Sequence, residues 1–332
     1  MSSEHTPISW LVTCALLAIA ARPAPAADTP SPALLVLNKE GSLAIVDPAS
    51  RKVVATVRTG NMPHEAAAST DGKLAFVSNY GDGSNPGNTL SVIDLSSQKE
   101  LHRVDLGVLS RPHGLAFAGG KLYFTSEANK IIGRYDPATN RIDWLMGTGQ
   151  NTTHMIELSK DLDQIYTANI GSDSISLFQR TGTQNWDQTV IPVGKGPEGF
   201  DVSPDGKELW AATSQDGGVS IIDIATKRVI YSMNVQTKRS NRLRFTPDGK
   251  LVLITDLTAG DLLILGRATR REIKRINLGH QPAGILVEPD SSRAYVAVTG
   301  DNNVAVIDLK TLELQARIPT GTGPDGMAWA VR

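Results

Sequence analysis

One short pattern recurs along almost the whole chain, and it constrains the fold more than any other feature. It consists of a Pro-x-Gly step, a short apolar strand, a turn such as Ser-Pro-Asp-Gly and a second strand, and residues 194–213 show it most clearly. The residue after the proline can be traced through seven copies, two of which lack the proline itself and are placed by their surrounding residues. The seven positions, 41 to 49 residues apart, are His64, His113, His154, Glu198, Asn241, Ala283 and Asp325. A period in the forties with several short strands per repeat is typical of the blades of a β-propeller.

Each repeat holds the residues of four short strands. The turn after the first strand contains proline, which presets the backbone angle, and glycine, which accepts a positive φ, as in residues 203–207 and 246–250. The second strand is apolar, as in residues 74–77, and the third alternates and ends in aspartate, as in residues 220–223. The sequence therefore predicts an all-β fold, a seven-bladed β-propeller of four-stranded antiparallel blades, as one domain over residues 28–332.

The two ends of the repeat region complete each other. Residues 34–38 match a second strand of the repeat, and residues 325–330 match a first strand. We therefore expect the last blade to be closed by both the N-terminal and the C-terminal strands, which removes an open sheet edge and locks the ring.

The strands also carry a family resemblance. Residues 76–79 (Phe-Val-Ser-Asn), residues 166–169 (Tyr-Thr-Ala-Asn) and the Val-Ile-Asp strands make the chain similar to YVTN-type β-propeller repeat proteins over about residues 33–331. The resemblance implies a seven-bladed, exported propeller. It does not imply one function, because such propellers include binding proteins, surface proteins and enzyme-like relatives.

The first 27 residues do not fit the repeat. Residues 10–21 form an apolar run, and residues 24–27 read Ala-Pro-Ala-Ala, an Ala-x-Ala cleavage pattern. We interpret residues 1–27 as a secretory signal peptide, with a disordered or anchoring tail as the alternative, since no Lys or Arg precedes the apolar run. The run is too short to span a bilayer, so we expect a periplasmic protein without a membrane span after cleavage.

Composition excludes several classes of site. Cys14 is the only cysteine, so a disulfide framework and a cysteine-based metal site are excluded after cleavage. The formal net charge is −1, and a nearly neutral chain is not built for electrostatic binding of nucleic acid. We therefore expect a monomer whose partner is a small ligand or a periplasmic protein.

The traced positions predict a site. The first strand of each blade lines the central tunnel, so residues at its start converge on the axis at one mouth. Three consecutive blades supply His64, His113 and His154, and the fourth supplies Glu198. Three imidazoles and a carboxylate form a ligand set for a divalent transition metal such as copper, iron or zinc. Thioethers beside two of the histidines, Met62 and Met155, favour copper.

Alternatives stay open at this point. The same residues can form a proton-transfer site, a polar tunnel wall or a passive ligand pocket. Arg242 is a further candidate, because Arg242 or Arg244 can clamp a substrate carboxylate, although we favour a pair between Arg244 and Asp201 of the neighbouring blade. The leading interpretation is a protein that binds a metal ion or small ligand. The alternatives are a metal-dependent oxidase or lyase, a lactonase-like hydrolase, and an interaction scaffold that uses rim loops such as residues 80–88.

Overall fold

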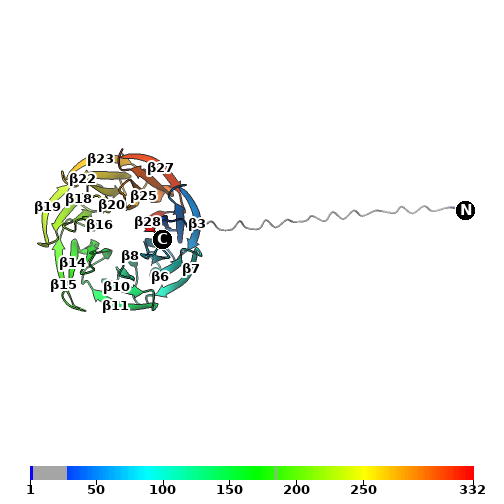
Figure 1. Cartoon of the computed structure of the whole chain (residues 1–332), viewed down its shortest axis with the longest axis horizontal. Helices are drawn as coiled ribbons and strands as arrows, with labels where there is room; N and C mark the ends of the chain where they lie inside the picture. The colour runs from blue at the N-terminus through cyan, green and yellow to red at the C-terminus, as the bar shows by residue number, and fades with distance from the viewer. Residues whose placement is uncertain (3–27, 184) are drawn as a thin grey trace.

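The computed structural model describes residues 1–2, 28–183 and 185–332. Seven sheets stand in a ring around a central axis (Figure 1). The predicted signal peptide lies outside the described residues. Within the described part of the chain, no helix is long and apolar enough to cross a membrane.

The ring consists of seven four-stranded antiparallel blades, which confirms the predicted fold class. We number the blades in chain order and give each from its innermost to its outermost strand. Blade 1 contains β4 (Pro63–Ala68), β5 (Leu74–Gly81), β6 (Pro86–Asp94) and β7 (Lys99–Asp105). Blade 2 contains β8 (Pro112–Ala118), β9 (Lys121–Ser126), β10 (Ile131–Asp136) and β11 (Arg141–Gly147). Blade 3 contains β12 (Thr153–Leu158), β13 (Gln164–Asn169), β14 (Ser174–Arg180) and β15 (Trp186–Pro192). Blade 4 contains β16 (Pro197–Val202), β17 (Glu208–Thr213), β18 (Gly218–Asp223) and β19 (Arg228–Asn234).

Blades 5 to 7 follow the same plan. Blade 5 contains β20 (Ser240–Phe245), β21 (Leu251–Asp256), β22 (Asp261–Gly266) and β23 (Arg271–Asn277). Blade 6 contains β24 (Pro282–Val287), β25 (Arg293–Val298), β26 (Asn303–Asp308) and β27 (Glu313–Pro319). Blade 7 contains β28 (Pro324–Ala330), β1 (Ala33–Asn38), β2 (Ser42–Asp47) and β3 (Lys52–Arg58). Two short 3-10 helices, η1 (Ile170–Ser172) and η2 (Thr299–Asp301), follow β13 and β25.

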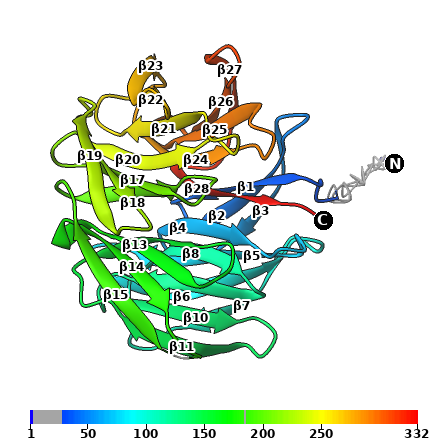
Figure 2. The same cartoon turned by 60° about the vertical axis from the view of Figure 1, so that its left-hand side comes forward.

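The predicted closure of the ring by both chain ends is confirmed. β28 pairs antiparallel with β1, and the register joins Ala33 to Ala330 and Leu35 to Ala328. Figure 2 shows the C-terminal strand beside the N-terminal one. The middle strands of each blade are buried on both faces because sheets pack on both sides, and this explains their nearly continuous apolar runs. The outermost strands, such as β19, are largely exposed.

Every inner strand is irregular at its start. The pairing between the first two strands of each blade shifts register there, for example between Pro63 and Ala66 and between Pro112 and Leu115. Equivalent shifts occur in the other five blades. A β-bulge re-aims side chains, and these bulges contain or adjoin the seven traced positions. The irregularity thus frees the traced residues from the regular alternation of the strand.

The expected rim loop at residues 80–88 is largely strand. β5 and β6 are longer than most other strands, and Gly81 still pairs with Pro86, so only residues 82–85 form the turn. Asp82 stabilises that turn by accepting hydrogen bonds from the backbone nitrogens of Ser84 and Asn85. The extra residues therefore extend a hairpin, which carries Tyr80 to the tunnel mouth.

Candidate functional site

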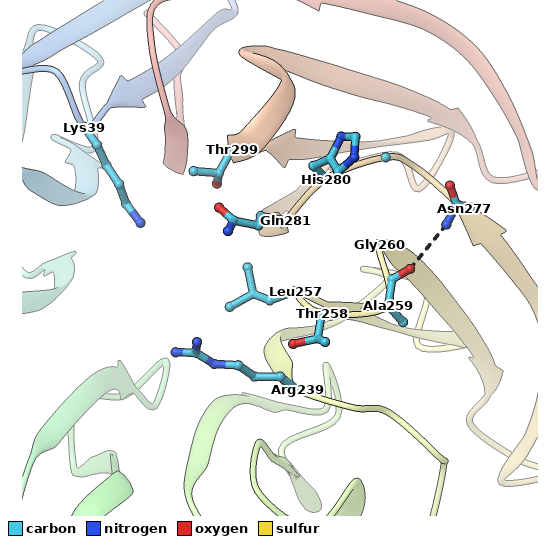
Figure 3. A pocket seen from close by; sticks show the side chains of 11 residues that line it. Lys39, Arg239, Leu257, Thr258, Ala259, Gly260, Asn277, His280, Gln281 and Thr299 are labelled. Carbon is cyan, nitrogen blue, oxygen red and sulfur yellow. Dashed lines mark hydrogen bonds between the residues drawn. The ribbon is translucent and has the colours of Figure 1, made fainter.

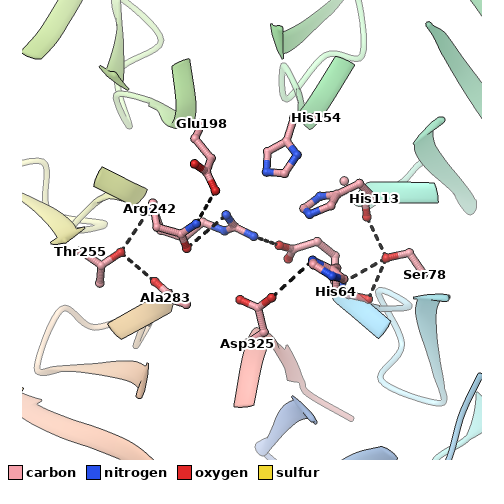
Figure 4. Close-up of polar contacts among 12 residues, drawn as sticks. His64, Ser78, His113, His154, Glu198, Arg242, Thr255, Ala283 and Asp325 are labelled. Atoms are coloured by element: carbon pink, nitrogen blue, oxygen red, sulfur yellow. Dashed lines mark hydrogen bonds and ion pairs between the residues drawn. The ribbon is translucent and has the colours of Figure 1, made fainter. Parts of the chain in front are cut away.

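The three traced histidines meet at one mouth of the tunnel, as the repeat predicts. The ring centroids of His64 and His113 are 5.0 Å apart, and those of His113 and His154 are 3.7 Å apart. Figure 4 shows these side chains turned towards the axis with Glu198, Arg242 and Asp325. Residues from separate blades therefore form one cluster.

Hydroxyl groups on the second strands fix the backbone beneath this cluster. Thr125 Oγ1 accepts a hydrogen bond from the nitrogen of Gly114 at 2.9 Å and donates one to the carbonyl of His154 in the next blade at 2.6 Å. Ser78 does the same between the nitrogen of Glu65 and the carbonyl of His113. Each hydroxyl thus satisfies a donor left free by the bulge and joins two neighbouring blades.

The short distance between the backbones of neighbouring blades explains the glycine of the Pro-x-Gly step. A Cβ atom built on Gly114 would lie 2.6 Å from the backbone oxygen of His154, and one built on Gly326 would lie 2.5 Å from that of His64. Only a residue without a Cβ lets the blades pack this closely at these positions. The repeat motif is therefore a packing device that places each traced side chain beside the next.

Glu127 joins the cluster from a position that the repeat does not single out. It directly follows β9, and its Oε1 is bonded to His154 Nδ1, while Oε2 accepts a hydrogen bond from Tyr80 at 2.6 Å. Potential ligand atoms of His113, Glu127 and His154 all lie within 4.8 Å of one another, and all three residues are buried. Among the described residues, this group is the one whose geometry can hold a metal ion. The one signal in the sequence is that Glu127 comes directly after β9, the strand that pairs with the strand of His113.

A second carboxylate stands behind His64. Asp325 Oδ2 lies 3.6 Å from His64 Nδ1 and 3.1 Å from the ammonium of Lys39. Tyr80 packs against both His64 and His113, with ring centroids 4.6 Å and 5.5 Å away. The traced Asp325 therefore orients a histidine and neutralises a lysine at the same time.

Burial sets the protonation states of these groups. It lowers the pKa of His113 well below its usual value, with help from the neighbouring imidazoles of His154 and His64. It lowers the pKa of His64 to about 4, although Asp325 opposes the shift. Burial alone would raise the pKa of Glu127, but the charge and hydrogen bond of His154 outweigh it and lower that pKa. At neutral pH the cluster therefore holds neutral imidazoles on His64 and His113 beside an ionised Glu127.

Two imidazole nitrogens in this cluster have no hydrogen-bond partner among the residues that the structure describes. They are Nδ1 of His113 and Nε2 of His154, and both are buried. Because Glu127 is ionised and has no proton to give, His154 donates through Nδ1, and in the neutral form of the ring Nε2 then carries a lone pair. A buried polar atom without a partner is destabilising by about 1–3 kcal/mol. The two nitrogens therefore lower the stability of the fold unless a ligand binds them.

The remaining candidate residues, Arg242 and Glu198, lie around the histidine cluster at the tunnel mouth. The guanidinium of Arg242 is buried and bonds Glu65 from blade 1, on the far side of the tunnel. Burial opposes the charge of Arg242, but Glu65 and other carboxylates raise its pKa. Glu198 accepts a hydrogen bond from the amide of Asn241. Arg242 is therefore engaged in an ion pair that crosses the tunnel, and Glu198 lies beside the histidines without belonging to the 4.8 Å group.

Two other expectations, on Arg244 and Met155, can be compared with the structure, together with the position of one further histidine. Arg244 contacts Asp201 at 3.7 Å, as favoured above, but it also makes a closer ion pair with Glu157. His280 stands on the rim, where its side chain is 85% exposed and bonds Asp301. The thioether argument for copper is wrong for Met155, because that side chain packs in the core between blades 3 and 4.

The cluster opens into a cavity of about 150 Å³, which we call the mouth cavity. Its lining is formed by Lys39, His64, Tyr80, His113, His154, Glu198, Arg239, Asn241, Arg242, Leu257, Ala283 and Asp325. Two larger hollows of about 690 and 500 Å³ share lining residues with it, including Arg239. A small molecule can therefore reach the histidines from this mouth.

The family assignment follows from a comparison of the sequence with known families. A family model described as outer membrane protein assembly factor BamB matches residues 39–276. The chain belongs to this family of PQQ-like propellers. Among curated proteins, it is similar to hydrazine synthase subunit beta of Kuenenia stuttgartiensis, with 25% identity over 44% of this chain and 51% of that protein. It is also similar to antigen Lp49 of Leptospira interrogans, with 26% identity over 30% of this chain and 22% of that protein. The match thus spans about half of the first of these relatives and less of the second.

Solved structures support the fold. Hydrazine synthase of K. stuttgartiensis superposes with a TM-score of 0.68 at 23% identity, covering 80% of this chain and 89% of that one. A candidate 6-phosphogluconolactonase of Bacteroides uniformis superposes with a TM-score of 0.76 at 16% identity, covering 90% and 99%. At these identities the likeness shows the propeller fold alone.

Proposed function

We propose that this propeller binds a divalent transition metal at the mouth of its tunnel, through His113 Nδ1 and His154 Nε2. The observation that carries the proposal is the pair of buried imidazole nitrogens without partners, beside the ionised Glu127. A group that lacks a partner inside a protein is destabilising, and a metal ion would satisfy both nitrogens at once.

The surroundings of the two nitrogens support a metal over a proton-transfer site. A metal needs neutral imidazole, and burial keeps His113 neutral far below pH 7. Histidine ligands commonly donate their second nitrogen to a carboxylate, as His154 does to Glu127 and as His64 can do to Asp325. His64 is the third imidazole within reach, and the mouth cavity leaves room for an exogenous ligand. Two or three imidazoles with a carboxylate suit zinc, iron or copper.

Metal titration of the untagged protein, first stripped with a chelator, tests this proposal. We expect about one zinc, copper or iron(II) ion per chain, and loss of that ion in His113→Phe, which keeps an aromatic ring and removes both nitrogens. His102→Ala is the matched control, because His102 lies on the outer strand β7 and bonds Tyr135 instead. Equal metal binding by His113→Phe and wild type, with both proteins folded by circular dichroism, would contradict the proposal.

We also propose that the chain is a YVTN-type propeller and that it is located in the periplasm. The YVTN-like strands and the N-terminal apolar run support an exported, periplasmic propeller. Fractionation of cells that produce the full chain, with N-terminal sequencing of the exported form, tests the location. A start near residue 28 in the periplasmic fraction is the expected result.

A second candidate is a role as a protein-binding subunit. The observation that favours it is the similarity to a protein named as a subunit of hydrazine synthase. The likeness to the B. uniformis protein concerns the fold alone and lends no support to a lactonase-like hydrolase. Cross-linking in the periplasm followed by mass spectrometry separates the candidates, since a metal-binding monomer gives no reproducible partner.

A further inference from the structure

One cationic side chain at the mouth, that of Arg239, has no partner within the described part of the chain. Arg239 precedes β20, is exposed, and points into the opening from the side opposite Lys39 (Figure 3). Its backbone nitrogen bonds Asp256, but among the described residues no ion pair or hydrogen bond to its guanidinium is present. Its neighbour Lys238 is also exposed and lines the adjoining hollow of about 500 Å³. The mouth therefore presents free positive charge above the histidines.

The carboxylates of the mouth are already engaged. Asp325 lies with Lys39 and His64, and Glu65 bonds Arg242. Glu127 accepts hydrogen bonds on both oxygens, and Glu198 accepts one from Asn241. With Asp256, which accepts hydrogen bonds from the backbone nitrogens of Lys238 and Arg239, five carboxylates face four cationic residues, namely Lys39, Lys238, Arg239 and Arg242. A bound divalent ion would leave the mouth with about one excess positive charge, in a recess where the field of the protein attracts anions.

From this charge balance we infer that the exogenous ligand of the site is a small oxyanion, carrying a carboxylate or phosphate group. The inference rests on the proposed metal site. One oxygen of the anion occupies the open position on the metal, and Arg239 binds the anion from the rim, where the flat guanidinium offers paired donors. Lys39 stands on the wall of the same cavity, but Asp325 already neutralises its charge. Arg242 takes no part, because Glu65 already holds it.

A spectroscopic titration tests this inference in two stages. The chain is first loaded with cobalt(II), whose visible absorption reports its coordination, and the affinity for cobalt is measured. Succinate, inorganic phosphate and the neutral analogue succinamide are then titrated separately. We expect succinate or phosphate to change the spectrum saturably and succinamide to leave it unchanged, and the tighter of the two anions identifies the group recognised.

Variants separate the two proposals. Arg239→Gln should weaken binding of the anion by about tenfold or more, since it removes a charge-assisted contact, and should leave the cobalt affinity within about twofold. Arg228→Gln is the matched control, because Arg228 is an exposed arginine on the outer strand β19. Cobalt binding without any response to anions, or equal anion affinity in Arg239→Gln and wild type, overturns the oxyanion inference alone. Failure to bind cobalt, zinc, copper or iron at all overturns the metal proposal first.

Discussion

Replacement of Thr125 by valine isolates the contact that holds His154 in place. The side chains have nearly the same shape, so the variant removes a hydroxyl without leaving a cavity. It leaves two buried groups without their partner, the nitrogen of Gly114 and the carbonyl of His154, which now lie 2.9 Å and 2.6 Å from the hydroxyl oxygen. Each orphaned group is destabilising by about 1–3 kcal/mol, so we expect the free energy of unfolding to fall by about 2–4 kcal/mol.

Urea unfolding followed by tryptophan fluorescence measures this change. The midpoint should fall while the slope with denaturant stays constant, because the surface exposed on unfolding is the same. Thr125→Ser keeps the hydroxyl and should lose about 1 kcal/mol or less, and Thr56→Val, on the exposed outer strand β3, should be nearly neutral. Affinity for metal should fall in Thr125→Val as well, since the His154 backbone loses its anchor. A loss below about 0.5 kcal/mol would refute the idea that these hydroxyls join the blades.

Two further predictions concern the ring as a whole. Deletion of residues 325–332 removes all but the first residue of β28 and exposes the edge of β1. We therefore expect calorimetry of the truncated chain to show no cooperative unfolding transition near that of the full chain. An unchanged melting temperature would contradict the argument that β28 closes the ring. Burial, reinforced by Asp201, raises the pKa of Glu157 from 4.5 to about 8, so this residue stabilises the fold at low pH and progressively less as pH rises towards 8. Relative to Glu157→Gln, the free energy of unfolding of the wild type should therefore fall by up to ~1 kcal/mol per pH unit between about pH 5 and 8. If the free energies of unfolding of the two proteins change in parallel with pH, Glu157 does not titrate in this range.

Much of the fold follows from the sequence because the repeat is a local signal. Turn residues and strand periodicity recur in each copy, and a copy that begins with a second strand, at residues 34–38, can only be completed by the last strand of the chain. The positions that face the tunnel follow from the same register. The repeat alone is therefore enough to place His64, His113 and His154 together.

The remaining parts of the site depend on side-chain direction, which a repeat does not specify. Glu127 lies one residue beyond a strand, and its side chain returns to the axis to reach His154. Tyr80 reaches the cluster only because Gly81 and Pro86 still pair and extend the ladder of β5 and β6, so that only residues 82–85 form the turn. Met155 is next to His154 in sequence, but its side chain packs in the core and not at the tunnel mouth. Adjacency to a site residue in the sequence therefore did not predict that the side chain of Met155 belongs to the site.

Equivalent positions in the ring also show what the fold itself requires. Blade 6 has Ala283 at the traced position, and its backbone carbonyl still accepts the hydrogen bond from Thr255 of the preceding blade, as that of His154 does from Thr125. Blade packing at this layer therefore needs a backbone carbonyl and no imidazole. His113 and His154 nevertheless bury nitrogens without partners, which a small apolar side chain would avoid. A polar tunnel wall gains stability from satisfied groups, whereas two nitrogens without a partner among the described residues lower it. If a metal ion binds the two nitrogens, as we propose, the stability lost at these positions would be recovered on binding.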